Sequence, residues 1–174
     1  MKKWFLLLLI IVLVGCTEKL PEFEKYAGLP LEIAVIGTAP DVRETNVVFE
    51  EFTMDDLLFV DTSVYDAVFI MKEHLEEASA AVYTEVYTSS KIPFIFIEST
   101  KGSDPFIYAD ETYDNTQQFG DGMKMKFAAG YVPSNDSETG PTTYNFGLYN
   151  DIKNDETVEG VYSHIFAMIE KHVK

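Results

Sequence analysis

Two short polar segments of the sequence combine the side chains that acid–base catalysis needs. Residues 72–74 read Lys-Glu-His and residues 98–100 read Glu-Ser-Thr, and each segment directly follows an apolar run. A histidine acts as a general base when a hydroxyl nucleophile lies within hydrogen-bond reach and a carboxylate orients its ring. His74 with Ser99 or Thr100 and a neighbouring glutamate is therefore a candidate set. No G-x-S-x-G motif singles out one hydroxyl as the nucleophile.

A third polar segment follows the first apolar run, at Gly37-Thr38-Ala39-Pro40. It lacks the G-x-G-x-x-G spacing of dinucleotide-binding loops and the lysine of a P-loop. Pro40 also removes a backbone amide that a phosphate group would need. The sequence therefore predicts neither a nucleotide site nor any other cofactor.

Acidic side chains in the second half of the sequence are candidates for calcium ligands, since calcium takes about six to eight oxygen ligands. Residues 135–140 resemble a calcium-binding loop only in their final glycine, and Phe146 stands where the closing glutamate should be. The simpler interpretation is that these acids are solvated loop residues. We expect no metal site on this pattern.

Four apolar runs, rich in β-branched or aromatic residues, predict strands at 31–37, 47–52, 66–71 and 92–97. The spacing of Leu75, Ala78, Val82 and Val86 predicts a helix over 75–89. A second apolar stripe, from Val158 to Val173, predicts a helix that begins at Asn154 or Asp155.

The order of these elements predicts an α/β fold. Near-continuous apolar strands alternating with helices are typical of parallel sheets covered on both faces. We therefore expect a small doubly wound, mostly parallel sheet, which resembles flavodoxin-like or Rossmann-like folds in element order. Residues 123–149 are expected to add antiparallel strands.

In such sheets, ligands bind outside the carboxyl ends of the strands. The loops after three predicted strands should meet there and form a rim for a small polar or charged ligand. The alternative is that the same side chains are ordinary solvated loop residues and helix caps. The candidate rim residues are Thr38, Asp41, Arg43, Lys72, Glu73, His74, Glu98, Ser99 and Thr100.

Charge and cysteine content exclude several classes of protein. The 174 residues include 13 basic and 29 acidic ones, for a net charge of −16. This acidity excludes nucleic acid and anionic lipid headgroups as partners, because both would be repelled. The single cysteine, Cys16, excludes an intrachain disulfide and a multi-cysteine metal cluster.

The amino-terminal residues have the pattern of a signal peptide. Lys2 and Lys3 precede an apolar stretch over residues 4–13, which is shorter than the roughly 20 residues that span a bilayer. The following Leu13-Val14-Gly15-Cys16 resembles the lipobox of bacterial lipoproteins. The resemblance implies that a diacylglyceryl group, with acyl chains such as palmitate, is attached to Cys16 and that residues 1–15 are removed. Two acyl chains suffice for stable anchoring.

The sequence thus predicts a lipoprotein on the extracytoplasmic face of the bacterial cell membrane, with a lipidated tether over residues 16–30 and one domain over 31–174. The expected function is non-enzymatic binding of an envelope protein or a small ligand. Two alternatives remain open. One is a lipid-anchored hydrolase or transferase with its site at the carboxyl ends of the strands, and the other is a calcium-dependent cell-wall-associated protein.

Overall fold

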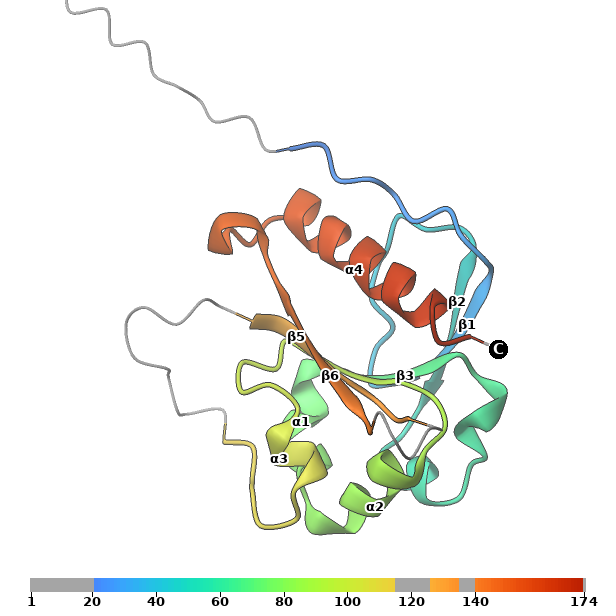
Figure 1. Ribbon diagram of the computed structural model, residues 1–174, viewed down its shortest axis with the longest axis vertical. Coiled ribbons are helices and arrows are strands. Elements are labelled where there is room, and N and C mark those ends of the chain that lie inside the picture. Colours follow the sequence, from blue (N-terminus) through green and yellow to red (C-terminus); the bar gives the residue numbers. More distant parts are fainter. Residues whose placement is uncertain (1–20, 115–125, 135–139, 174) are drawn as a thin grey trace, which may run out of the picture.

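Within residues 21–114, 126–134 and 140–173, which the computed structural model describes, six strands form one sheet (Figure 1). They are β1 (Leu31–Ile36), β2 (Val47–Phe52), β3 (Ala67–Ile70), β4 (Phe94–Ile97), β5 (Lys126–Val132) and β6 (Thr142–Gly147). Their order across the sheet is β2-β1-β3-β4-β5-β6.

The first four strands are parallel, and their positions agree with the predicted runs. β1 pairs with β2 and β3, and β3 pairs with β4. Strands β3 and β4 are buried at every position, which explains why their sequences show no polar alternation. β2 lies at one edge of the sheet and is partly exposed.

The last two strands make the sheet mixed. β5 runs antiparallel to both β4 and β6, and these two strands supply the antiparallel pairing expected for residues 123–149. The α/β class is confirmed, whereas the mostly parallel, doubly wound arrangement is not. A parallel crossover must return the chain to the opposite end of the sheet. Here β5 begins at the end where β4 stops, because Ile97 pairs with Ala128.

Helices cover both faces of the sheet (Figure 1). On one face, α4 (Asp155–Glu170) buries Phe166, whose ring stacks on Phe69 of β3 at 6.2 Å. On the other face lie α1 (Leu75–Ala78), α2 (Ala81–Ser89) and α3 (Asp104–Ile107). Single 3-10 turns complete the described chain: η1 (Asp55–Leu58), η2 (Thr62–Val64), η3 (Lys72–His74) and η4 (Tyr149–Asp151).

The predicted carboxyl-terminal helix is confirmed as α4. Asn154 caps it, because its side chain accepts a hydrogen bond from the Thr157 amide at 2.9 Å, and the Thr157 hydroxyl accepts one from the Asn154 amide at 3.2 Å. This reciprocal capping satisfies amides that the first helical turn leaves without partners.

The single helix predicted over 75–89 is wrong. The chain forms two helices separated at Ser79 and Ala80, and Ala80 has an extended backbone. The Ser79 hydroxyl accepts a hydrogen bond from the distant Tyr113 amide at 2.9 Å. The break changes the helical phase, so Tyr83 and Tyr87 are buried while Val82 is 59% exposed.

Residues 21–30, which belong to the expected tether, lie along α4 and the loop before β2. Phe23 packs against Gly160 of α4, and Tyr26 is buried. The Asn46 side-chain amide donates a hydrogen bond to the Gly28 carbonyl at 2.9 Å. The chain is therefore fixed to the domain from Phe23 onward.

Candidate functional site

A cavity of about 430 Å³ lies where β3 and β4 end and β5 begins. Three lysines of the described chain line it. Lys72 belongs to η3, Lys126 is the first residue of β5, and Lys153 directly precedes the α4 cap, Asn154. Of the described residues, Glu98, directly after β4, is the carboxylate that lines it. Thr100, Tyr113, Phe127 and Leu148 also belong to its wall.

Glu98 joins two of these lysines. Its Oε2 atom lies 2.8 Å from Lys153 Nζ and 3.1 Å from Lys72 Nζ. The backbone φ of Glu98 is 57°, in the left-handed region that favours glycine. A non-glycine residue held there costs on the order of 1–3 kcal/mol, and such strain clusters at functional sites.

The pKa of Glu98 lies below its usual range. Partial burial raises this pKa, but the hydrogen bonds and positive charges of Lys153 and Lys72 together outweigh that effect. The side chain is therefore a carboxylate at neutral pH, and it neutralises part of the positive charge around the cavity.

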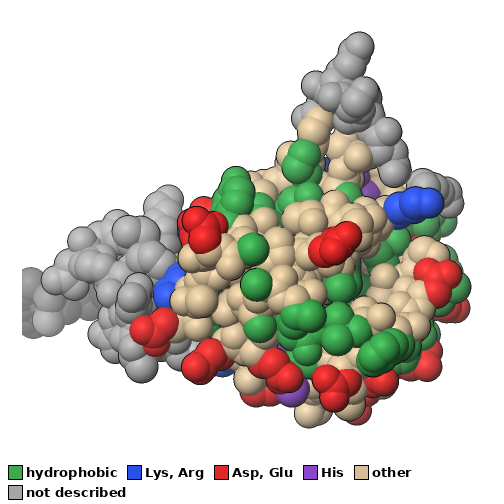
Figure 2. All heavy atoms as spheres, turned by 90° about the horizontal axis from the view of Figure 1, so that it is seen from below, with side chains coloured by type: hydrophobic (Ala, Val, Ile, Leu, Met, Phe, Trp, Pro, Cys, Tyr) green, Lys and Arg blue, Asp and Glu red, His purple; other side chains and the backbone are tan. Residues whose placement is uncertain are grey.

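The positive charge of the cavity exceeds what Glu98 neutralises. No carboxylate of the described residues lies within ion-pair distance of Lys126. Lys101 adds a further ammonium group next to the cavity, since its Nζ lies 5.3 Å from the centre of the Tyr113 ring. On the face in Figure 2, most of the charged side chains are acidic (red), and few are basic (blue).

Three of the nine predicted rim residues line the cavity: Lys72, Glu98 and Thr100. Ser99 is adjacent but fully buried, and its hydroxyl donates a hydrogen bond to the Gly102 carbonyl at 2.8 Å. The Thr100 amide donates to the Tyr113 hydroxyl at 3.2 Å. Ser99 and Thr100 thus take part in the turn that shapes the cavity wall.

The loops after β1 and β3 meet beside the cavity. The Thr38 amide donates a hydrogen bond to Glu73 Oε1 at 3.4 Å, and Gly37, at a φ of 107°, leaves no room for a Cβ against Glu73. His74 Nδ1 lies 3.5 Å from Glu77 Oε2. No hydrogen bond among the described residues joins His74 to Ser99 or Thr100, so the candidate catalytic set is not assembled.

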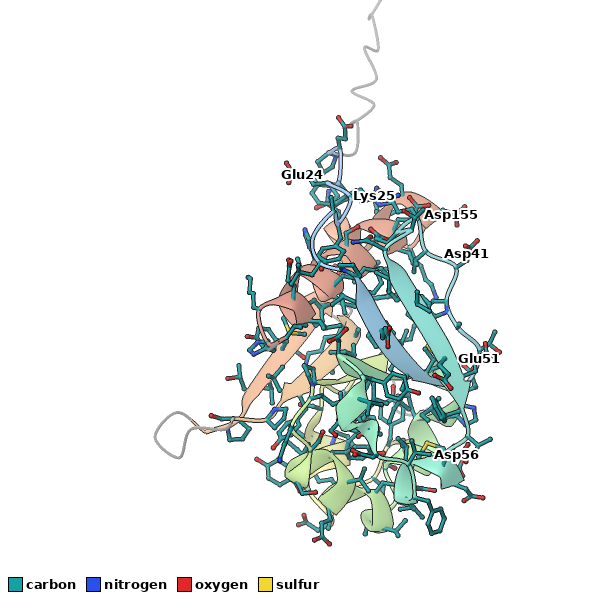
Figure 3. All side chains as sticks on the ribbon, turned by 90° about the vertical axis from the view of Figure 1, so that its right-hand side faces the viewer. Glu24, Lys25, Asp41, Glu51, Asp56 and Asp155 are labelled. Carbon is teal, nitrogen blue, oxygen red and sulfur yellow. The ribbon has the colours of Figure 1, made fainter. Side chains whose placement is uncertain are left out.

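Arg43 and Asp41 lie away from the rim. Because β2 is parallel to β1, residues 37–46 must return to the opposite end of the sheet, and they carry Arg43 to α4. Its guanidinium donates to the Phe23 carbonyl at 3.0 Å and to the Ser163 hydroxyl at 2.9 Å. Asp41 is exposed in the same loop, outside β2 (Figure 3).

The sequence analysis missed Lys126 and Lys153 as site residues. The expected antiparallel strands could have predicted the position of Lys126. A strand that is antiparallel to β4 and follows it directly begins at the end of the sheet where β4 stops. Lys153 precedes the predicted cap of α4, but only the tertiary structure brings that cap to Glu98.

A second cavity of about 390 Å³ lies at the opposite end of the parallel strands. It is lined by residues before β3 and β4, among them Asp66 and Lys91, and by His172 after α4. Burial and the charge of Lys171 lower the pKa of His172. This second cavity has a lysine of its own, Lys91. A substitution of Lys91 is therefore a control for substitutions of the lysines in the first cavity.

Within the described ranges, no group of three or more histidine, cysteine, aspartate or glutamate side chains is placed to hold a metal ion. No helix in those same ranges has the length and apolar character needed to cross a membrane. Cys16 and the signal-peptide pattern lie outside the residues that the structure describes.

No protein-family model matches the sequence, and no curated protein or solved structure is significantly similar to it.

Proposed function

We propose that the protein is a lipid-anchored, extracytoplasmic binding domain whose small-molecule ligand occupies the cavity at the carboxyl ends of β3 and β4. The observation that carries the proposal is a cavity of about 430 Å³ lined by three lysines, two of which, Lys72 and Lys153, form ion pairs with Glu98. Small-molecule sites are typically concave, with volumes of about 300–1,000 Å³ and a few convergent polar groups. The lipobox resemblance at Leu13-Val14-Gly15-Cys16 supports the anchor.

Binding is favoured over catalysis by the surroundings of the candidate nucleophiles. The Ser99 hydroxyl is buried and donates to a backbone carbonyl, and His74 lies beside Glu77. A general base must lie about 2.6–3.2 Å from the atom whose proton it removes, or reach that atom through one water. The cavity instead offers ammonium groups, which attract and hold a ligand.

We also propose a flavodoxin-like origin for the parallel part of the sheet, because its strand order is β2-β1-β3-β4. Flavodoxin-like sheets share the order 2-1-3-4 and bind ligands outside the carboxyl ends of their strands. The cavity lies at that end of β3 and β4.

Thermal unfolding of the full-length lipidated protein in neutral detergent tests this function. The panel contains organic acids, phosphomonoesters, sugars, amino acids and divalent cations. A ligand at a hundred times its Kd adds about 2.7 kcal/mol, which raises Tm by several degrees. We expect at least one such shift, lost in the Lys72→Ala/Lys153→Ala double variant and retained in Lys91→Ala. A flat panel, or a shift that survives the double variant, contradicts the proposal.

A further inference from the structure

We infer that the ligand is a small organic anion, with a carboxylate or phosphate group, and that Glu98 occupies the position of that group in the free protein. This inference rests on the proposed function and names the chemistry of its ligand. The binding lysines are Lys72, Lys126 and Lys153.

The charge balance of the cavity is the first argument. Among the residues that the structure describes, three ammonium groups and one carboxylate line it, in a chain whose net charge is −16. The Lys72 and Lys153 side chains are 61% and 51% exposed, so solvent screens part of the repulsion between the ammonium groups, and an anion bound between them weakens it further. One carboxylate leaves an excess of two positive charges, and Lys101 lies close by on the Tyr113 ring. A bound anion reduces this excess.

The geometry of Glu98 is the second argument. A single oxygen, Oε2, contacts both Lys72 and Lys153, as one oxygen of a ligand carboxylate or phosphate would. The backbone of Glu98 has a φ in the left-handed region, which residues other than glycine rarely adopt. Lys126 has no carboxylate partner among the described residues and is available to a second oxygen of the ligand.

The apolar part of the wall is the third argument. Tyr113, Phe127 and Leu148 are each less than 10% exposed and line the cavity, Tyr113 from one face of the sheet and Phe127 and Leu148 from the other. The Tyr113 ring is held against Phe106 at 5.6 Å, nearly parallel to it. Such a rigid apolar surface favours an anion with a planar or apolar body over a bare inorganic ion.

Four probes that share one ring test the inference: benzoate, phenyl phosphate, benzyl alcohol and benzylamine. Each is titrated calorimetrically at low salt into the full-length lipidated protein in neutral detergent, and titrations into empty micelles are subtracted. We expect at least one of the two anions to bind about tenfold or more tightly than the neutral and cationic probes. The tighter anion identifies the source of the negative charge.

Two variants with opposite expected effects test the site. Lys126→Ala should weaken anion binding about tenfold, because a charge-assisted hydrogen bond is lost. Glu98→Gln should strengthen it about tenfold, because the internal competitor for Lys72 and Lys153 loses its charge. The matched control, Lys91→Ala, removes a lysine from the other cavity and should change the Kd by less than about twofold.

Several results would overturn the inference. A preference for benzylamine or benzyl alcohol, with a Kd that Lys126→Ala changes, would refute an anionic ligand. That result would leave the proposed binding function standing. Weaker anion binding in Glu98→Gln would refute the role of Glu98. Loss of anion binding in Lys91→Ala would move the site to the second cavity. No heat with any probe, together with a flat thermal panel, would contradict the proposed function itself.

Discussion

Arg43 and Glu44 form a charged pair beneath the amino-terminal segment. The Glu44 side chain is fully buried, and its Oε1 accepts hydrogen bonds from the Ser163 hydroxyl at 2.6 Å and the Tyr26 amide at 3.2 Å. Arg43 Nε lies 3.7 Å from that oxygen. Glu44 Oε2 and Arg43 Nε are buried without a hydrogen-bond partner among the described residues. This pair therefore carries a large desolvation cost and depends on both members.

Replacing Arg43 alone should cost more stability than replacing both residues. Arg43→Met leaves the Glu44 carboxylate buried without its cation, which costs about 3 kcal/mol. Arg43→Met/Glu44→Gln leaves no such charge and should recover part of that loss. Urea denaturation at neutral pH measures both values, and a double variant less stable than Arg43→Met would contradict the assignment.

Glu98 should stabilise the fold in a pH-dependent manner. Its pKa is lower in the folded protein than the usual value of 4.5, so its contribution is present above that value and is lost as pH falls through the folded pKa. The stability advantage of the wild type over Glu98→Gln should thus be full near pH 7 and vanish as the pH falls through the lowered folded pKa. Urea denaturation from pH 7 to pH 3 measures it. A difference that does not change with pH would contradict the ion pairs with Lys72 and Lys153.

Individual elements follow the sequence where their determinants are local. The apolar runs that became β1 to β4 are short and lie between polar segments, and α4 combines an apolar stripe with its own cap. The break between α1 and α2 depends instead on the Tyr113 amide, 34 residues away. No local pattern contains that contact, so the sequence predicted a continuous helix.

Gly160 of α4 contacts the amino-terminal segment at Phe23, so replacing this glycine with alanine should destabilise the protein. In most helices the same substitution is stabilising. An alanine Cβ at Gly160 would lie 2.6 Å from Phe23 Cγ, so Gly160→Ala must displace that ring and should destabilise by about 1–2 kcal/mol. In a Phe23→Ala background the same change should stabilise by up to about 1 kcal/mol, because alanine favours helix. Chemical denaturation of the four proteins measures this. Destabilisation in both backgrounds would show that Phe23 is not the obstacle.

For the whole molecule, the rule that ligands bind at the carboxyl ends of parallel strands predicted part of the cavity lining. It selected Lys72, Glu98 and Thr100 correctly as neighbours. It failed for Arg43, because the β1–β2 connection contains no helix and crosses to α4 instead. It could not find Lys153, whose distance to Glu98 depends on how α4 packs on the sheet.

The proposed lipid anchor depends on Cys16, so a substitution of Cys16 tests it. We expect the wild-type protein to incorporate labelled palmitate and to sediment with membranes. Cys16→Ala should do neither and should keep residues 1–15, because the lipobox resemblance implies that lipid attachment precedes cleavage. Mature-sized, acyl-labelled Cys16→Ala protein would refute the lipoprotein assignment.

The most direct test of the ligand site is an acetylation footprint of the lysines, read by mass spectrometry with and without saturating phenyl phosphate or benzoate. A ligand in the cavity covers the amines that line it. We expect several-fold slower acetylation at Lys72, Lys126 and Lys153, and an unchanged rate at Lys91 in the second cavity. Protection of Lys91 alone would contradict a ligand in this cavity. So would acetylation rates that the anion leaves unchanged at each of the four lysines.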